Sequence, residues 1–232
     1  MSKNLIVAID GPAGSGKSTS AKLVAQKLGY VYIDSGAMYR AITYLAIKKK
    51  ILDNEKAISK LANNSDIYLD YIDGETRIKV NGEDITEGLR SIDVNQNVSE
   101  VSRIEEVRKA LVEKQKAIGN QNRGLVMEGR DITTVVFPNA DVKIFLTASI
   151  EQRAKRRAEE YEKKGVSVSL DEIKKNILER DKIDSTRKLS PLKKASDAIE
   201  IDTSKVSIEE QVNLILKQVK LVAKRKNIPV KN

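Results

Sequence analysis

The feature that most constrains the fold is an apolar run near the N-terminus that ends in a glycine-rich turn. Residues 5–19 read Leu-Ile-Val-Ala-Ile-Asp-Gly-Pro-Ala-Gly-Ser-Gly-Lys-Ser-Thr and match the pattern G-x-x-x-x-G-K-[ST]. Glycine suits such a turn because it reaches positive φ and lets a phosphate approach the backbone closely. The pattern therefore predicts a strand, a phosphate loop and a helix in that order. A chance match is disfavoured because the expected strand precedes the glycine-rich turn and the expected amphipathic helix follows it.

The residue types within this loop each have a physical role toward a nucleotide. Lys17 supplies a point charge for the β- and γ-phosphates, and the Ser18 hydroxyl is placed to meet Mg²⁺. The helix that follows directs its positive N-terminal end at the anion. The expected nucleotide-binding set is Gly11, Pro12, Ala13, Gly14, Ser15, Gly16, Lys17, Ser18 and Thr19.

Composition limits the chemistry that the chain can perform. Its 232 residues are 40% apolar, which predicts one folded domain, and its net charge of +9 fits a protein that handles nucleotides or nucleic acid. The chain has no cysteine and no histidine, which excludes disulfides, Cys/His zinc sites and histidine-dependent triads. The groups that remain available for catalysis are Lys, Arg, Asp and Ser side chains and a metal ion bound by oxygen ligands. We expect a cytoplasmic protein, since no apolar run approaches membrane-spanning length.

The order of the expected elements predicts a parallel sheet. Residues 17–28 carry apolar side chains at helical spacing, residues 30–33 read as a strand, and a further helical pattern runs through Ile42, Leu45 and Ala46. Such alternation is typical of a parallel sheet with crossover helices. Ligands of these sheets lie beyond the carboxyl ends of the strands, where the phosphate loop and residues 34–35 both fall.

The pattern changes between about residues 66 and 90. Two short strands with an Asp-Gly turn predict a hairpin, and Asn-Gly closes a second turn, so we expect a small antiparallel insert. Helical spacing resumes between residues 92 and 118. Strands are predicted at 124–128, 142–146 and 198–202, and capping boxes begin helices at Ser169 and Ser207. The tail after about Lys224 is expected to be loose.

Arginines cluster in the second half of the chain. Arg153, Arg156 and Arg157 share one helical face, and Lys163-Lys164-Gly165 ends that helix. A solvated surface helix is one interpretation. The other, which we favour beside a phosphate loop, is a lid whose guanidiniums stabilise a transferring phosphoryl group. The remaining set suggests a second anionic ligand that faces the loop; it comprises Gly129-Arg130-Asp131, Arg180, Asp184 and Arg187.

These residues together resemble the bacterial cytidylate kinase family, whose members phosphorylate CMP and dCMP. The matching blocks are residues 11–19, 34–40 (Asp-Ser-Gly-Ala-Met-Tyr-Arg), 128–131 (Glu-Gly-Arg-Asp), 153–157 (Arg-Ala-Lys-Arg-Arg), 190–198 (beginning Ser-Pro-Leu) and 201–204. They cover nearly the whole chain, and the 34–40 block and the basic helix discriminate best. The chain departs from the family pattern at Thr133, where many relatives have glycine.

The resemblance implies an α/β architecture. It is a three-layer fold around the P-loop, with a five-stranded parallel sheet, a small antiparallel β insert in the NMP-binding region and a short helical lid. We expect a single nucleoside monophosphate kinase domain over residues 1–232. Within it, residues 1–40, 120–150 and 185–232 form the core, about 41–119 form the NMP-binding region with its β insert, and about 151–184 form the lid.

The resemblance also implies a role for each site residue. Residues 11–19 hold ATP and, through Ser18, Mg²⁺; the expected catalytic residues are Lys17, Arg130, Arg153, Arg156 and Arg157. Arg40 and Arg130 hold the CMP α-phosphate, and Arg180 and Asp184 meet the ribose. Ser35, Ser99, Arg108, Asp131 and Arg187 surround the base. The expected product is CDP or dCDP, formed by a monomer that binds neither nucleic acid nor membrane.

Two other functions remain open at this point. A P-loop kinase for another acceptor, such as shikimate or another nucleoside monophosphate, fits the loop but leaves the base-pocket residues unexplained. A nucleic-acid-binding P-loop ATPase fits the charge of +9, but with two Phe and no Trp its stacking platforms for bases would depend on seven tyrosines.

Overall fold

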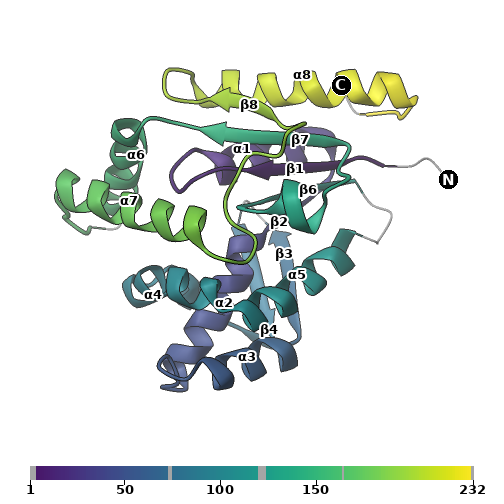
Figure 1. Ribbon diagram of the computed structural model, residues 1–232. Coiled ribbons are helices and arrows are strands. Elements are labelled where there is room, and N and C mark those ends of the chain that lie inside the picture. The colour runs from purple at the N-terminus through teal and green to yellow at the C-terminus, as the bar shows by residue number, and fades with distance from the viewer. Residues whose placement is uncertain (1–3, 73–74, 120–123, 164, 231–232) are drawn as a thin grey trace.

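The molecule is organised around one parallel sheet. A computed structural model describes residues 4–72, 75–119, 124–163 and 165–230. The sheet has the order β2-β6-β1-β7-β8, with β1 (Ile6–Asp10) at its centre (Figure 1). The other strands are β2 (Val31–Asp34), β6 (Leu125–Gly129), β7 (Val142–Thr147) and β8 (Ile199–Asp202), and every pair is parallel. The five-stranded parallel sheet predicted from the sequence is confirmed.

Helices cover both faces of this sheet because its central strands are apolar on both sides. Leu5, Val7 and Ile9 pack against α1 (Lys17–Leu28) and α8 (Ile208–Lys226). Ala8 and neighbouring residues of β6 pack on the opposite face against α5 (Glu105–Gly119) and the π-helical turn η2 (Ile132–Val136). The result is the expected three-layer arrangement.

A second apolar core holds together the helices that lie on the far side of the sheet from α8. It is formed by α2 (Ser35–Lys48), α3 (Glu55–Asn64), α4 (Ile92–Arg103) and α5 (Glu105–Gly119). The sequence analysis did not identify α3, which begins at an N-cap whose side chain is Asn54. The helical spacing between residues 92 and 118 belongs to two helices, because the backbone leaves the helical conformation at Ile104.

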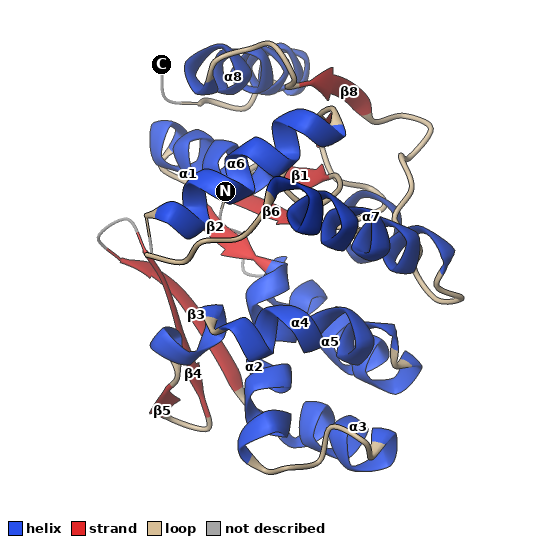
Figure 2. Ribbon diagram, turned by 90° about the vertical axis from the view of Figure 1, so that its left-hand side faces the viewer, coloured by secondary structure: helices blue, strands red, loops and turns tan. Residues whose placement is uncertain are grey.

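The antiparallel insert is a three-stranded sheet beside α2 (Figure 2). It contains β3 (Ile67–Ile72), β4 (Glu75–Val80) and β5 (Glu83–Asp84). The predicted Asp73-Gly74 turn lies outside the described residues. The predicted Asn81-Gly82 turn is confirmed, and both of its residues have positive φ. The insert also reaches back to the main sheet, where the Tyr71 ring packs edge-on against Tyr32 at 5.2 Å between centroids.

A helix pair, α6 (Ile150–Glu162) and α7 (Leu170–Thr186), extends beyond the carboxyl end of β7. The capping boxes predicted at Ser169 and Ser207 are both present. The prediction of a loose tail after Lys224 is wrong for most of its length. Helix α8 continues to Lys226, and Ile228 and Val230 pack against the main core. Within the described part of the chain, no helix has the length and apolar character that crossing a membrane requires.

Candidate active site

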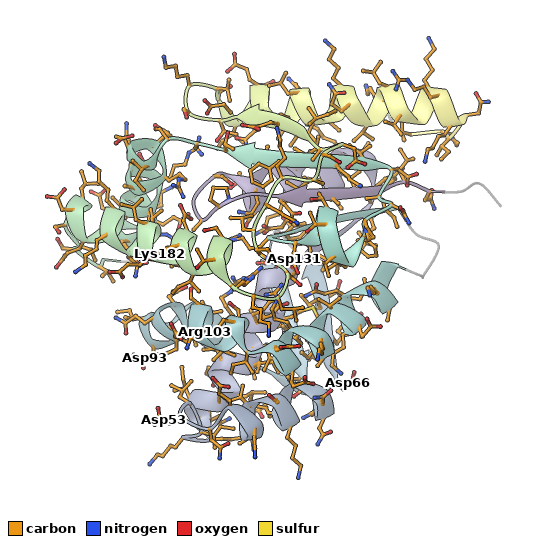
Figure 3. The ribbon with its side chains drawn as sticks, in the orientation of Figure 1. Asp53, Asp66, Asp93, Arg103, Asp131 and Lys182 are labelled. Carbon is orange, nitrogen blue, oxygen red and sulfur yellow. The ribbon has the colours of Figure 1, made fainter. Side chains whose placement is uncertain are left out.

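The candidate site lies where three neighbouring strands end. The phosphate loop follows β1, Ser35 follows β2, and the Arg130-Asp131 pair follows β6. Parallel register aligns these ends, because Asp10 is paired with Gly129 and Asp34 with Glu128. Figure 3 shows Asp131 near the middle of the molecule, between the sheet and the helices of the second core. Segments that are far apart in sequence therefore meet at one edge of the sheet, as expected for this topology.

The phosphate loop needs glycine at two positions for different reasons. Gly16 has φ 87° and forms the N-cap of α1, a conformation that side chains with a Cβ rarely adopt. Gly11 lies so close to β7 that a Cβ there would be 2.1 Å from the Leu146 carbonyl oxygen. No side chain caps the N-terminus of α1. Its first backbone N–H groups are thus free of a side-chain competitor for a phosphate.

Lys17 is enclosed by the loop that it belongs to. Its Nζ donates to the Pro12 carbonyl at 2.7 Å and to the Ser15 hydroxyl at 3.5 Å. Burial and the nearby positive charge of Arg130 lower the pKa of Lys17 to about 7. Because an anion would favour the charged form, a phosphate here would raise this pKa again.

Glu128 is a site residue that the sequence analysis did not assign. It ends β6 and is buried, and its Oε1 accepts hydrogen bonds from the Ser18 hydroxyl and from Tyr32 Oη at 3.1 Å. Burial and the neighbouring Asp34 raise the pKa of Glu128. The sequence held a signal for this role: a carboxylate at the end of an apolar strand that pairs with the strand before the phosphate loop.

The donor set at this point fits a magnesium ion. Ser18 and Glu128 offer a hydroxyl and a carboxylate oxygen in direct contact with each other. In the described ranges, no group of three or more acidic or histidine side chains could hold a metal without other ligands. Mg²⁺ ordinarily takes one or two protein oxygens and completes its shell with waters and substrate phosphates, so this small set is sufficient.

The residues that the sequence analysis expects on the acceptor side, called the acceptor residues below, include two buried ion-paired groups. Arg130 Nε donates to Asp184 Oδ2 at 2.9 Å, and Arg187 Nη1 donates to Asp184 Oδ1 at 3.3 Å. Against the effect of burial, these arginines keep the pKa of Asp184 below its ordinary value. Arg108 donates to Asp131, and both side chains are almost fully buried.

The remaining acceptor residues lie around these pairs. The Ser35 hydroxyl donates to the Glu128 carbonyl at 2.7 Å, and Arg40 Nη2 donates to Asp34 Oδ2 at 2.5 Å. Ser99 is buried on α4, and its carbonyl accepts the Ser102 hydroxyl at 2.9 Å. The Ser102 carbonyl in turn accepts a hydrogen bond from Arg108 Nη1 at 3.1 Å, so α4 lies directly against the Arg108 guanidinium.

The three arginines of α6 differ in their contacts. Arg153 Nη1 donates to the Ala13 carbonyl at 3.2 Å and to Asp181 Oδ2 at 2.6 Å. Arg156 donates to the Gly14 carbonyl at 3.3 Å and also to Thr203. Arg157 instead pairs with Glu160 on its own helix. Two of the three are therefore attached to the phosphate loop, and Arg157 is not.

Cations from four helices and from the segment after β6 lie close enough to affect one another. Burial lowers the pKa of Arg180 to about 10, helped by the positive charges of Arg130, Arg157 and Arg40. Arg130 acts in the same way on Lys17. Such mutual repulsion is unfavourable in the folded protein unless an anion offsets it, and it therefore marks this region as a binding site for negative charge.

Comparison with known proteins gives concordant results. The model of the family described as cytidylate kinase matches residues 7–221. The cytidylate kinase of Geobacillus sp. (strain WCH70) is 51% identical over 220 residues, which are 94% of this chain and 98% of that protein. The cytidylate kinase of Bacillus subtilis (strain 168) is 49% identical over the same shares. A crystal structure of an uncharacterized protein from Eubacterium ventriosum has the same fold, with a TM-score of 0.54 at 16% identity over 94% of this chain and 99% of that one.

Proposed function

Because the chain belongs to the cytidylate kinase family, we propose that this site transfers the γ-phosphoryl group of ATP to CMP and dCMP, giving CDP and dCDP. The observation that carries the proposal is the convergence of Lys17, from the phosphate loop, with Arg130 and Arg180, from the acceptor side. A reaction between two anionic phosphates requires positive charge on both sides of the transferred group.

On the donor side, residues 11–19 bind the ATP phosphates. Lys17 pairs with the β- and γ-oxygens, while Ser18 and Glu128 hold Mg²⁺. Mg²⁺, when bound, neutralises part of the phosphate charge and orients the γ-phosphoryl group. Arg153 and Arg156 keep the loop in place through its carbonyls, and Arg157 adds charge over the donor phosphates.

On the acceptor side, Arg40 and Arg130 hold the α-phosphate of CMP, since guanidinium forks match phosphate oxygens. Arg180 and Asp184 meet the ribose. Ser35, Ser99, Arg108, Asp131 and Arg187 surround the base. The acceptor phosphate is already ionised at neutral pH, so the reaction needs no general base. Catalysis then consists of in-line positioning and charge stabilisation in a site closed to water.

The Arg108–Asp131 pair supports cytosine as the base. Cytosine presents an N4 donor beside N3 and O2 acceptors, so Asp131 accepts from N4 while Arg108 donates to the ring. Uracil reverses that edge and would set its O4 against a carboxylate. Each mismatched buried group costs on the order of 1–3 kcal/mol, so CMP is expected to exceed UMP at least tenfold in kcat/KM.

The division of labour along the chain follows from the same proposal. Residues 41–119, with the β insert, bind the nucleoside monophosphate, and residues 151–184, which include α6 and α7, close over the donor phosphates as a lid on a single-domain core. We further propose that the enzyme works as a monomer in the cytoplasm. Its excess positive charge then serves nucleotides instead of nucleic acid.

An ADP-release assay with several candidate acceptors tests this function. We expect turnover with CMP and dCMP, much less with UMP or AMP, and none with shikimate or single-stranded RNA. Lys17→Ala should abolish turnover in an enzyme that still folds, because it removes two hydrogen bonds within the phosphate loop but no side chain of the apolar cores. ADP release stimulated by RNA but not by CMP would overturn the proposal.

A further inference from the structure

A buried carboxylate just before the phosphate loop has no role in the mechanism above. Asp10 ends β1, immediately ahead of Gly11, and is fully buried. Its Oδ1 accepts the Ile132 backbone N–H at 2.9 Å. Its Oδ2 accepts both the Thr133 N–H at 2.7 Å and the Thr133 hydroxyl at 2.6 Å. These three hydrogen bonds join two segments separated by more than 120 residues.

The two joined segments belong to opposite halves of the site. Asp10 leads directly into the loop of the donor side, while Ile132 and Thr133 directly follow Arg130 and Asp131 on the acceptor side. Strand pairing aligns Asp10 with Gly129 but extends no further, since β1 and β6 both end there. Beyond that point, the hydrogen bonds of the Asp10 carboxylate connect the two segments.

This arrangement is unfavourable for the carboxylate itself. In the described part of the chain, no cation lies within ion-pair distance of Asp10, and burial together with the nearby Asp131 charge raises its pKa to about 6 despite the hydrogen bonds. A buried charge without an ion pair is costly. An apolar side chain here would leave the Ile132 and Thr133 N–H groups unpaired, so the carboxylate holds the segment after Asp131 against the end of β1.

We propose that Asp10 and Thr133 are positioning residues, which set Arg130 and Asp131 at a fixed place relative to the phosphate loop; this rests on the function proposed above. Three acceptor contacts on one carboxylate determine where η2 begins and hence where the two residues before it lie. The Thr133 hydroxyl makes one of the three contacts.

Variants at Thr133 test the proposal without touching either binding loop. Thr133→Val keeps the shape and removes the hydroxyl, Thr133→Ser keeps the hydroxyl, and Thr133→Ala serves if valine prevents folding. Val219→Ala is the control for lost stability, because Val219 is also fully buried but packs in the main core on α8, outside the residues that bind either substrate. The measured quantities are kcat, the KM values for CMP and ATP, and the melting temperature.

We expect Thr133→Val to raise the KM for CMP roughly threefold or more, with lower kcat and an unchanged KM for ATP, as befits a lost hydrogen bond to a charged group. Thr133→Ser should restore both values, and Val219→Ala should lower the melting temperature without changing the KM for CMP. An unchanged KM for CMP in Thr133→Val, or equal shifts of that KM in Thr133→Val and Val219→Ala, would overturn the proposal. A wild-type enzyme that prefers another acceptor would refute the proposed function alone, and the KM comparison would then be made with that acceptor.

Discussion

The buried pair between Arg108 and Asp131 makes a sharp test of how the site is built. The two side chains are 1% and 4% exposed, so water can solvate neither charge if its partner is removed. We consider Asp131→Leu, Arg108→Met and the double variant. The pair joins α5 to the segment after β6, which are far apart in sequence.

Removing one partner of a buried ion pair typically costs ~3–5 kcal/mol, because the other charge is left uncompensated. The structure predicts which single variant is worse. Among the described residues, the contacts left to Arg108 without Asp131 are the Ser102 carbonyl and a Tyr39 ring 5.1 Å away. Without Arg108, Asp131 retains Arg187 at 4.0 Å. Asp131→Leu should therefore lie at the upper end of that range and Arg108→Met at the lower end.

The double variant removes both charges and should cost far less than the sum of the single variants, since apolar replacement of a buried pair is often nearly neutral. Urea unfolding at pH 7 gives the free energies. In a chain of this length, the single variants should melt roughly 6–20 °C lower than wild type. Additive costs, or a loss below about 1 kcal/mol in Asp131→Leu, would refute the claim that the two charges depend on each other.

Three further predictions use other parts of the site. ATP binding at pH 8 should be accompanied by the uptake of on the order of one proton, because Lys17, with its pKa near 7, is mostly neutral at that pH and regains its charge beside phosphate. Calorimetry in two buffers of different ionisation enthalpy measures the proton uptake, and Lys17→Met should abolish it. Arg157→Ala should lower kcat more than it raises the KM for CMP, whereas a raised KM with unchanged kcat would place Arg157 on the acceptor side. The pKa of Asp10 is raised from 3.8 to about 6, so the charged form becomes a growing cost as pH rises from 4 through 6. Wild type should lose about 2 kcal/mol relative to Asp10→Asn over that interval, and parallel curves in urea unfolding would contradict the assignment.

The sequence predicts the parts of the site whose recognition is local. The phosphate loop depends on residues that are neighbours in the chain, and the capping boxes at Ser169 and Ser207 are determined within four residues. The hairpin insert and the apolar strands likewise follow from short patterns of alternation and turn chemistry. The roles of the arginines were inferred from the resemblance to a family. The contacts that each arginine makes could not be inferred in that way.

Other features are invisible to local patterns. The tail after Lys224 reads as polar and loose, but helix α8 continues because its apolar face packs on β1 and α1. The α6 arginines look equivalent in sequence, yet Arg153 and Arg156 reach the phosphate loop and Arg157 does not. Such differences depend on where a distant segment lies, which spacing along one helix cannot specify.

The sequence alone determined the strands of the main sheet and which edge of that sheet carries the site, since parallel strands joined by right-handed crossovers leave few alternatives. Only the tertiary structure decided which charges face one another. Glu128 meets Ser18 across strands, and Asp10 meets Thr133 across the whole N-terminal half of the chain. The physical reason is that buried polar groups must find partners through packing, and those partners come from whichever segments the sheet brings together.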